Sequence, residues 1–304
     1  LLAQVAYFEK NAARPPRVFE YYLDAILFKS VLPPLPAVMK QDCLFYGRSG
    51  VHTLQALMTG DRPWVTAHIN PWLFGRLAWD PTVDEKKLVR EFCDFRYGAG
   101  AAAMARYYAR LEEAFGMLLY LSPEEALPEK YTPMLKIFDE PPTDVEDNWF
   151  APAKVKAERA GRIEKLDSLI NDASRYLDEA GTDASKNAWH EEKKYFDLVR
   201  PWTVFSAERI RLYAALADGR MDEARSHLKK CDAGMNEVLA WGDKNIKEKK
   251  YRRNFRLMRL YNWRLRMDKI RADYFAPSWK RPFIKLGNMV RLGWLFIRLQ
   301  RAFE

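Results

Sequence analysis

The uneven distribution of proline constrains the fold of this chain more than any other feature of its sequence. Fourteen of the 17 prolines lie at or before Pro152, and only Pro201, Pro277 and Pro282 follow it. Proline lacks a backbone N–H and clashes with the preceding turn of a helix. The first half must therefore be built from short elements, whereas the second half can form long helices.

The first eighty residues predict a small β/α unit. Residues 17–23 (RVFEYYL) and 51–57 (VHTLQAL) are short, rich in β-branched and aromatic residues, and bounded by turn residues, which is typical of buried strands. Residues 32–36 (LPPLP) must be extended, and residues 36–46 are expected to form a helix that ends at Gly47. The order of strand, loop, helix and strand indicates parallel β/α packing.

From Asp80 onward the pattern becomes helical. Acidic residues and a proline precede apolar positions with helical spacing up to Tyr97, and a second helix is expected over about residues 101–121. Residues 122–152 are rich in proline and acidic residues, so we expect them to wrap the surface.

Beyond Pro152 the sequence predicts antiparallel bundle helices. Apolar residues recur there at alternating intervals of three and four, which produces a narrow apolar seam. The two seams comprise Ile163, Leu166, Ile170, Ala173 and Leu177, and Met221, Ala224, Leu228, Cys231, Met235 and Val238. Residues 189–216 form another amphipathic span, which we expect to be kinked or split at Pro201. Gly181, Gly219 and Gly242 occupy positions where helices are expected to end.

Positive charge is concentrated at the C-terminus. The formal net charge is +9, yet residues 246–304 alone hold 17 Lys and Arg against four Asp and Glu, which leaves the rest slightly acidic. One interpretation is a basic arm for a polyanion, because aromatic residues interleave with cations over 249–271 and could stack on nucleic-acid bases. Residues 291–301 could likewise lie on an anionic membrane.

The favoured interpretation of the same arm is a packed helix with solvated arginines. Its apolar positions keep helical spacing, which predicts a stripe that faces the bundle while the cations remain in water. The stripe comprises Phe255, Met258, Tyr261 and Leu265.

Several classes of protein find no support in the sequence. There is no run of about 18 apolar residues for a transmembrane helix, and three distant cysteines cannot form a disulfide scaffold or a zinc cluster. The run at residues 98–103 fits a G-x-G-x-x-A fingerprint, but a helix rather than a strand precedes it, so a turn between helices is predicted. His190-Glu191-Glu192 lacks the second histidine of a zincin, because position 194 is Lys. We therefore expect neither a metal nor a cofactor.

The segment from Gly47 to Gly100 carries the most functional information. A candidate strand contains Gln55, and the following loop holds Trp64 and Asn70 among other polar and aromatic residues. In a (β/α)8 barrel the site is built at the carboxyl ends of the strands and in the following loops, and exposed tryptophans suit the apolar faces of sugars. The alternative is that Trp72 and Trp79 are core residues of the next helix, and for Trp79 this is the favoured prediction.

These motifs resemble a known family. Asn70-Pro71-Trp72-Leu73, the run from Arg76 to Pro81, Tyr97-Gly98-Ala99 and Tyr107-Tyr108 look like the uncharacterised bacterial, glycoside-hydrolase-like "domain of unknown function 4838". Members of that family pair a hexosaminidase-like or α-glucuronidase-like barrel with a helical C-terminal region. The resemblance covers about residues 1–120.

The resemblance implies that the chain starts inside the barrel, near its last two strands. The catalytic carboxylates would then lie upstream of Leu1, so the catalytic residues are unknown and enzymatic activity is uncertain. In such barrels, residues on the last strands hold the sugar. The resemblance therefore implies that the residues contacting a glycan are Tyr22, Gln55, Trp64 and Asn70. Gln55 stands where related hexosaminidases often have a carboxylate. Such proteins are generally exported.

The predicted fold is therefore mainly α with a small α/β part: the last β/α elements of a (β/α)8-type barrel, followed by an antiparallel helical bundle. The predicted domains are 1–80 (incomplete barrel), 81–152 (helical hairpin and surface loop) and 153–304 (bundle with basic C-terminal helices). The predicted function is the C-terminal portion of a glycoside hydrolase acting on an oligo- or polysaccharide. The alternatives are a helical interaction module whose basic arm binds a polyanion, and a non-catalytic carbohydrate-binding or scaffolding protein.

Overall fold

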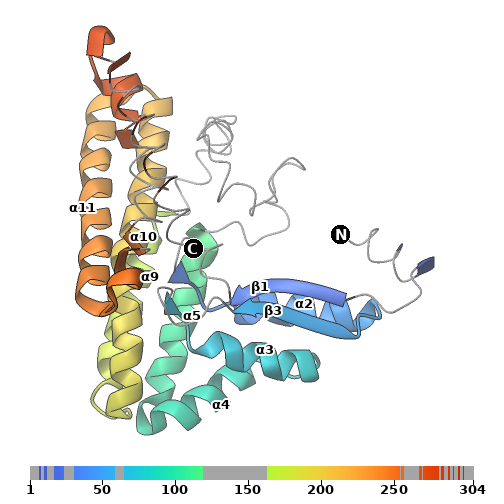
Figure 1. The fold of residues 1–304 in the computed structure, drawn as a ribbon. Helices are drawn as coiled ribbons and strands as arrows, with labels where there is room; N and C mark the ends of the chain where they lie inside the picture. Colours follow the sequence, from blue (N-terminus) through green and yellow to red (C-terminus); the bar gives the residue numbers. More distant parts are fainter. Residues whose placement is uncertain are drawn as a thin grey trace. The chain divides into compact units, whose positions relative to one another are not determined.

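The computed structural model confirms a mostly helical chain with a small parallel β part (Figure 1). It describes residues 17–23, 31–58, 65–118, 163–253, 255–256, 267–268 and 270–280, together with positions 7, 10–11, 282–283, 287, 290, 294 and 297. The predicted surface segment at 122–152 and Trp64 lie outside these residues. Two compact units are present, the first formed by Leu1–Pro128 and Arg162–Arg200 and the second by Glu129–Gly161 and Pro201–Glu304. The division into domains at residues 80 and 152 stays a prediction.

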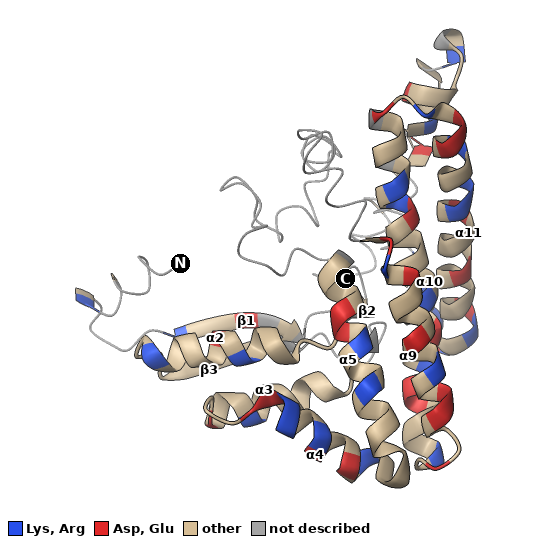
Figure 2. Cartoon of the chain, turned by 180° about the vertical axis from the view of Figure 1, so that it is seen from behind, with Lys and Arg blue, Asp and Glu red and all other residues tan. Residues whose placement is uncertain are grey.

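The first unit begins with the predicted β/α arrangement. Strand β1 (Arg17–Leu23) pairs in parallel with β3 (Thr53–Met58), and α2 (Pro36–Arg48) lies between them in the sequence. Helix α2 runs along one face of this two-stranded sheet (Figures 1 and 2). Pro36 occupies its first turn, where the missing N–H costs nothing. Met39, Cys43 and Tyr46, spaced by four and three residues, are buried.

The segments that follow the carboxyl ends of β1 and β3 are themselves paired. Strand β2 (Val31–Leu32) comes after β1, strand β4 (Val65–Thr66) comes after β3, and the two pair in parallel. A second short ladder therefore joins the two loops where a (β/α)8 barrel would carry its functional residues.

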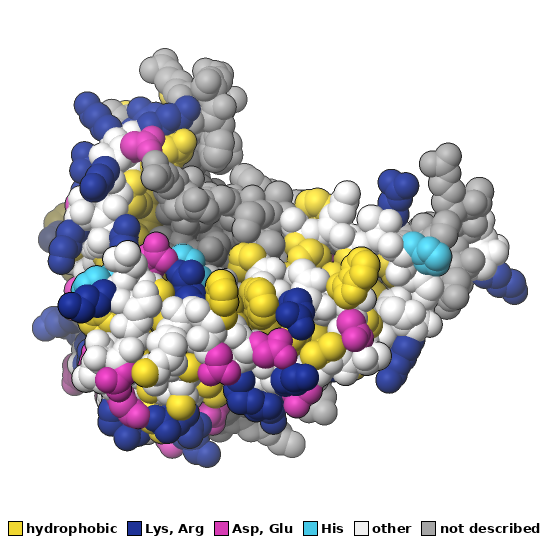
Figure 3. Space-filling model, turned by 90° about the horizontal axis from the view of Figure 1, so that it is seen from below, with side chains coloured by type: hydrophobic (Ala, Val, Ile, Leu, Met, Phe, Trp, Pro, Cys, Tyr) yellow, Lys and Arg dark blue, Asp and Glu magenta, His cyan; other side chains and the backbone are white. Residues whose placement is uncertain are grey.

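Three helices complete the region before residue 119: α3 (Ile69–Trp79), α4 (Glu85–Tyr97) and α5 (Ala101–Leu118). The carboxylate of Asp84 caps α4 by accepting a hydrogen bond from the backbone N–H of Lys86 at 2.8 Å. Trp79 is 90% exposed, so its predicted place in the core is wrong. Seen from below, the described surface carries Lys and Arg interspersed with Asp, Glu and hydrophobic side chains (Figure 3).

The glycine run after α4 is a turn between helices, as predicted. Gly98–Gly100 forms a single 3₁₀ turn, η1, between α4 and α5, and Gly98 has a φ of 56°. A Cβ on Gly100 would lie only 2.9 Å from the carbonyl oxygen of Ala180, at the end of α9 (Leu166–Ala180). Gly100 therefore allows the close approach of the end of α9, and Gly98 provides the positive φ of the turn.

The predicted seams are buried. All five positions of the first seam, from Ile163 to Leu177, are at most 4% exposed, and α9 packs against α5 within the first unit. In α11 (Met221–Asn245) the second seam is buried from Ala224 to Val238. Helix α10 (Lys186–Ala217) is not split at Pro201, although the boundary between the two units falls there.

Two of the three predicted glycine stops are confirmed, and the third is wrong. Gly181 follows α9 and Gly219 follows α10, the latter with a φ of 72°. Gly242 lies inside α11, which continues to Asn245. A Cβ at Gly242 would overlap the ring of Phe255, which is fully buried. The packed interpretation of the basic arm is thus confirmed at Phe255, whereas Met258, Tyr261 and Leu265 lie outside the described residues.

Candidate functional site

A polar layer lies between β1 and α2. The hydroxyl of Tyr22 donates a 2.6 Å hydrogen bond to Oδ2 of Asp42, and the hydroxyl of Tyr46 donates one to Oε1 of Glu20. Burial raises the pKa of Tyr22 and, despite the hydrogen bond from Tyr22, also that of Asp42. Because these side chains meet on the helix-covered face of the sheet, they hold α2 on the strands.

The sequence patterns did not predict this layer. Glu20 and Asp42 belong to different elements, and each meets a tyrosine of the other element. Strand alternation could have indicated the position of Glu20. Side chains two residues apart in a strand point to the same face, so Glu20 lies with Val18 on the face of β1 that packs against α2.

Asn70 links the segment that follows β2 to the end of β1. Its amide nitrogen donates hydrogen bonds to the carbonyl oxygens of Pro33 (2.7 Å) and Tyr22 (3.4 Å), and its Oδ1 accepts one from the backbone N–H of Leu35 (3.2 Å). The side chain is fully buried. The structure therefore brings two of the predicted sugar-binding residues together, Tyr22 and Asn70, and their contacts here are with the protein.

Gln55 lies on the other face of the sheet. It is the register partner of Phe19 in β1, so the two side chains stand next to each other on the face opposite α2. Gln55 is exposed and Phe19 is 50% exposed. Of the four predicted sugar-contacting residues, Gln55 is thus the one that the described structure leaves open to solvent.

A buried carboxylate joins the helices of the first unit. Glu192 in α10 is fully buried and accepts hydrogen bonds from three tyrosine hydroxyls, those of Tyr97 (3.2 Å), Tyr107 (3.0 Å) and Tyr108 (2.9 Å). Burial raises the pKa of Glu192, and the charge of His68 together with the three hydroxyls lowers it only in part. The three tyrosines belong to the motifs that carry the family resemblance, so this contact gives those motifs a structural role.

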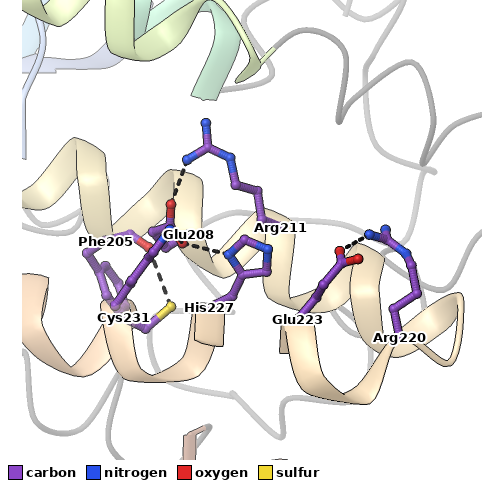
Figure 4. A network of polar contacts seen from close by, with 8 residues as sticks. Phe205, Glu208, Arg211, Arg220, Glu223, His227 and Cys231 are labelled. Atoms are coloured by element: carbon purple, nitrogen blue, oxygen red, sulfur yellow. Dashed lines mark hydrogen bonds and ion pairs between the residues drawn. The ribbon is translucent and has the colours of Figure 1, made fainter. Parts of the chain in front are cut away.

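The second unit holds a network around Glu208 (Figure 4). The carboxylate of Glu208 is 4% exposed and lies 2.7 Å from Nδ1 of His227 and 2.6 Å from Nη1 of Arg211. Burial raises the pKa of Glu208, but hydrogen bonds from His227 and Arg211 outweigh burial, and the pKa falls below its ordinary value.

A carboxylate and the histidine that it orients are two of the three members of a catalytic triad, so the third member, a neighbouring nucleophile, decides what this network can do. Cys231, one helical turn after His227, points its Sγ at the carbonyl oxygen of Phe205 at 3.9 Å (Figure 4). Burial raises the pKa of the Cys231 thiol to about 12. A thiolate is the reactive form of cysteine, so this arrangement stabilises the helix pair rather than activating a nucleophile.

Within the described residues, no group of three or more His, Cys, Asp and Glu side chains is placed to hold a metal ion. Cys43 and Cys93 are buried like Cys231, and burial raises the pKa of both thiols. Across the same part of the chain, no helix has the length and apolar character needed to cross a membrane.

No curated protein and no solved structure matches the chain. One family model does match, over residues 10–110. The match runs from before β1 into α5 and includes Asn70 and the three tyrosines that bind Glu192. The resemblance carried by the sequence motifs is thereby confirmed over residues 10–110, which match the model of a domain of unknown function, DUF4838.

Proposed function

We propose that residues 10–110 supply the last two strands of a (β/α)8-type barrel in a glycoside-hydrolase-like protein that acts on a glycan. In this proposal the domain contributes residues that contact the sugar, and the catalytic carboxylates come from elsewhere in the barrel. The exposed pair of Phe19 and Gln55 is the observation that carries the proposal.

A parallel sheet is normally covered on both faces, because its crossover helices and its core leave neither face to water. Here α2 covers one face of the β1–β3 pair, and the other face presents an aromatic ring that is half exposed. In a (β/α)8 barrel the helices form the outer ring and the opposite face of each strand points into the barrel. The open face therefore fits an inward face that further strands would enclose.

The chemistry of this face suits a sugar. The amide of Gln55 can both donate to and accept from hydroxyl groups, and an aromatic ring such as that of Phe19 can cover the apolar side of a pyranose. Trp64, in the loop after β3, stays a predicted stacking residue. Tyr22 and Asn70 then act as positioning residues, because their polar atoms hold α2 and the loop at Pro33 and Leu35.

Glycan binding by the full-length protein tests the proposal. We would measure binding to immobilised oligosaccharides that end in N-acetylhexosamine or glucuronic acid, and follow hydrolysis of those that bind. Gln55→Ala and Trp64→Ala should each weaken binding by about tenfold, the order of one lost hydrogen bond or stacking contact. Gln41→Ala is the matched control, because Gln41 is an exposed glutamine on α2. Unchanged binding in both test variants, or an equal loss in the control, would refute the site.

A further inference from the structure

The open face of the β1–β3 pair carries a cation as well as the pair of Phe19 and Gln55. Exposure alternates along β1, because Arg17 and Phe19 are exposed whereas Glu20, on the face toward α2, is half-buried. Arg17 is the register partner of Thr53 in β3. Side chains two residues apart in a strand point to the same face, so this pair stands beside that of Phe19 and Gln55. Arg17 therefore gives the open face its positive charge.

Within the described residues, Arg17 has no carboxylate partner. No acidic side chain in that part of the chain forms an ion pair with it. The acidic residue of β1, Glu20, lies on the opposite face and accepts a hydrogen bond from the hydroxyl of Tyr46. Arginine carries a fixed positive charge in proteins. Whatever covers this face must therefore accommodate that charge.

The two strands leave room for further strands. In the described structure each of β1 and β3 pairs with one strand, so each keeps an edge to which another strand can be added. A sheet of two strands is marginally stable by itself, and a parallel sheet is normally covered on both faces. Covering this face removes Arg17 from water, which costs a large free energy unless the charge is paired. The covering element is therefore expected to bring a carboxylate.

The position of Arg17 along β1 indicates where that carboxylate comes from. Arg17 is the first residue of β1, and its last residue, Leu23, lies about 20 Å away along the strand. Ligands of a (β/α)8 barrel bind at the carboxyl ends of the strands, and the interior below them is a packed core. The ring of Phe19 lies between Arg17 and that end. The partner of Arg17 is therefore expected to be a protein side chain rather than a glycan.

A second copy of this chain is a poor occupant of the face. The side chains that it would present are those of Arg17, Phe19, Thr53 and Gln55. None of these four is acidic, so a symmetric pairing of two open faces would bury two arginines without a carboxylate. Strands from a different sequence can supply one.

We propose that further parallel strands cover the open face of β1 and β3 and place an Asp or Glu against Arg17 at the amino-terminal end of β1. This inference rests on the proposed barrel and adds the chemistry by which its strands recognise each other. The buried ion pair would fix which strands dock on this face and in which register.

Thermal unfolding in two contexts tests the pairing. In the full-length protein, Arg17→Gln would leave the partner carboxylate buried and unpaired, so the unfolding midpoint should fall by about 5–10 °C. In the chain of 304 residues, where Arg17 is exposed, the same change should shift the midpoint by less than about 2 °C. Arg17→Lys keeps the charge and should recover part of the loss. Arg90→Gln, at an exposed arginine of α4, is the matched control and should have a small effect in both contexts.

Cross-linking identifies the partner. Arg17→Lys introduces an amine, which a carbodiimide joins through an amide bond to a carboxylate in contact with it. Mass spectrometry of the full-length protein should find position 17 linked to an Asp or Glu outside the 304 residues. A link to an acidic residue within the 304 residues, or an unchanged midpoint in full-length Arg17→Gln, would overturn the proposal. So would weaker glycan binding by Arg17→Gln at an unchanged midpoint, which would assign Arg17 to an acidic sugar.

The docking and the glycan site can fail separately. Gln55→Ala and Trp64→Ala report on glycan binding, whereas Arg17→Gln reports on the enclosure of the sheet. A lowered midpoint in Arg17→Gln, together with glycan binding that neither Gln55→Ala nor Trp64→Ala changes, would support the docking and refute the glycan site. An unchanged midpoint in Arg17→Gln with weakened binding in the other two variants would do the reverse.

Discussion

The hydroxyl of Tyr107 donates a hydrogen bond to the carboxylate of Glu192 across 85 positions of sequence. Both side chains are buried, Tyr107 within the DUF4838 match and Glu192 beyond it. The buried core of the first unit is therefore completed by a helix that the family match does not include. An isolated 10–110 fragment would leave the hydroxyls of Tyr97, Tyr107 and Tyr108 without this acceptor.

Removing one of these hydroxyls should destabilise the protein. Tyr107→Phe eliminates a buried hydrogen bond and leaves the carboxyl group of Glu192 with one partner fewer, so we expect the free energy of unfolding to fall by about 1–3 kcal/mol. The measurement is urea unfolding followed by circular dichroism. Tyr176→Phe is the control, because the Tyr176 ring packs under Arg106 and Arg175 and keeps that contact. A loss in the control equal to that of Tyr107→Phe would contradict the assignment.

The buried Glu192 should make stability fall as pH rises. Its folded pKa lies above the ordinary value of 4.5 because of burial, so the folded state keeps its proton at pH values where the unfolded state has lost it. Stability is then greatest below pH 4.5 for this group and decreases as pH rises through the folded pKa. Glu192→Gln, which stays neutral, should abolish that slope when the two proteins are compared by urea unfolding at successive pH values. Parallel pH profiles would show that Glu192 is not the titrating group.

Glu208 should show the opposite sign. Although burial raises its pKa, the hydrogen bonds from His227 and Arg211 hold the folded value below 4.5. This group therefore stabilises the fold above the unfolded pKa, and the stability is lost as pH falls through the folded pKa. We expect Glu208→Gln to cost about 2–3 kcal/mol at neutral pH and progressively less in acid. A cost that does not change with pH would indicate lost packing rather than lost charge.

Asn70 should be a stability residue. Asn70→Ala leaves the buried backbone groups of Pro33 and Leu35 without their partner, so we expect a loss of about 2–4 kcal/mol in thermal or urea unfolding. The same experiment on Gln41→Ala, an exposed position, should change stability by less than about 0.5 kcal/mol. If Asn70→Ala lowered glycan affinity and left the stability of the protein unchanged, Asn70 would instead be a residue that contacts the glycan.

Gly242 should not tolerate a methyl group. A Cβ there would overlap the ring of Phe255, and overpacking of this kind costs about 1–3 kcal/mol. Gly75→Ala, inside α3 with nothing within 4 Å of the new Cβ, should instead stabilise by about 0.5–1 kcal/mol. Thermal unfolding should show that the double variant Gly242→Ala/Phe255→Leu regains part of the lost stability, because the smaller leucine side chain removes the overlap.

Local sequence signals were sufficient for much of the fold. Proline placement separated short elements from long helices, strand-like composition located β1, and the apolar spacing of Ile163 to Leu177 identified a buried seam. The motif around Asn70 and Tyr97 predicted the match of residues 10–110 to a family model. Each of these depends on neighbours within a few residues, since backbone geometry and helical or strand periodicity are local properties.

Long-range contacts decided the remainder. Gly242 has the local pattern of a helix stop, yet α11 continues past it to Asn245, and the nearby ring of Phe255 leaves room for glycine but not for a Cβ. Glu192 was part of a failed zincin motif in the sequence, and only the packing of α4, α5 and α10 surrounded it with three hydroxyls. The sequence by itself determined the element types, the resemblance of residues 10–110 to a family model and the charge of the C-terminal arm. The tertiary structure alone decided which polar side chains are buried, because burial and hydrogen-bond partners arise from elements distant in sequence.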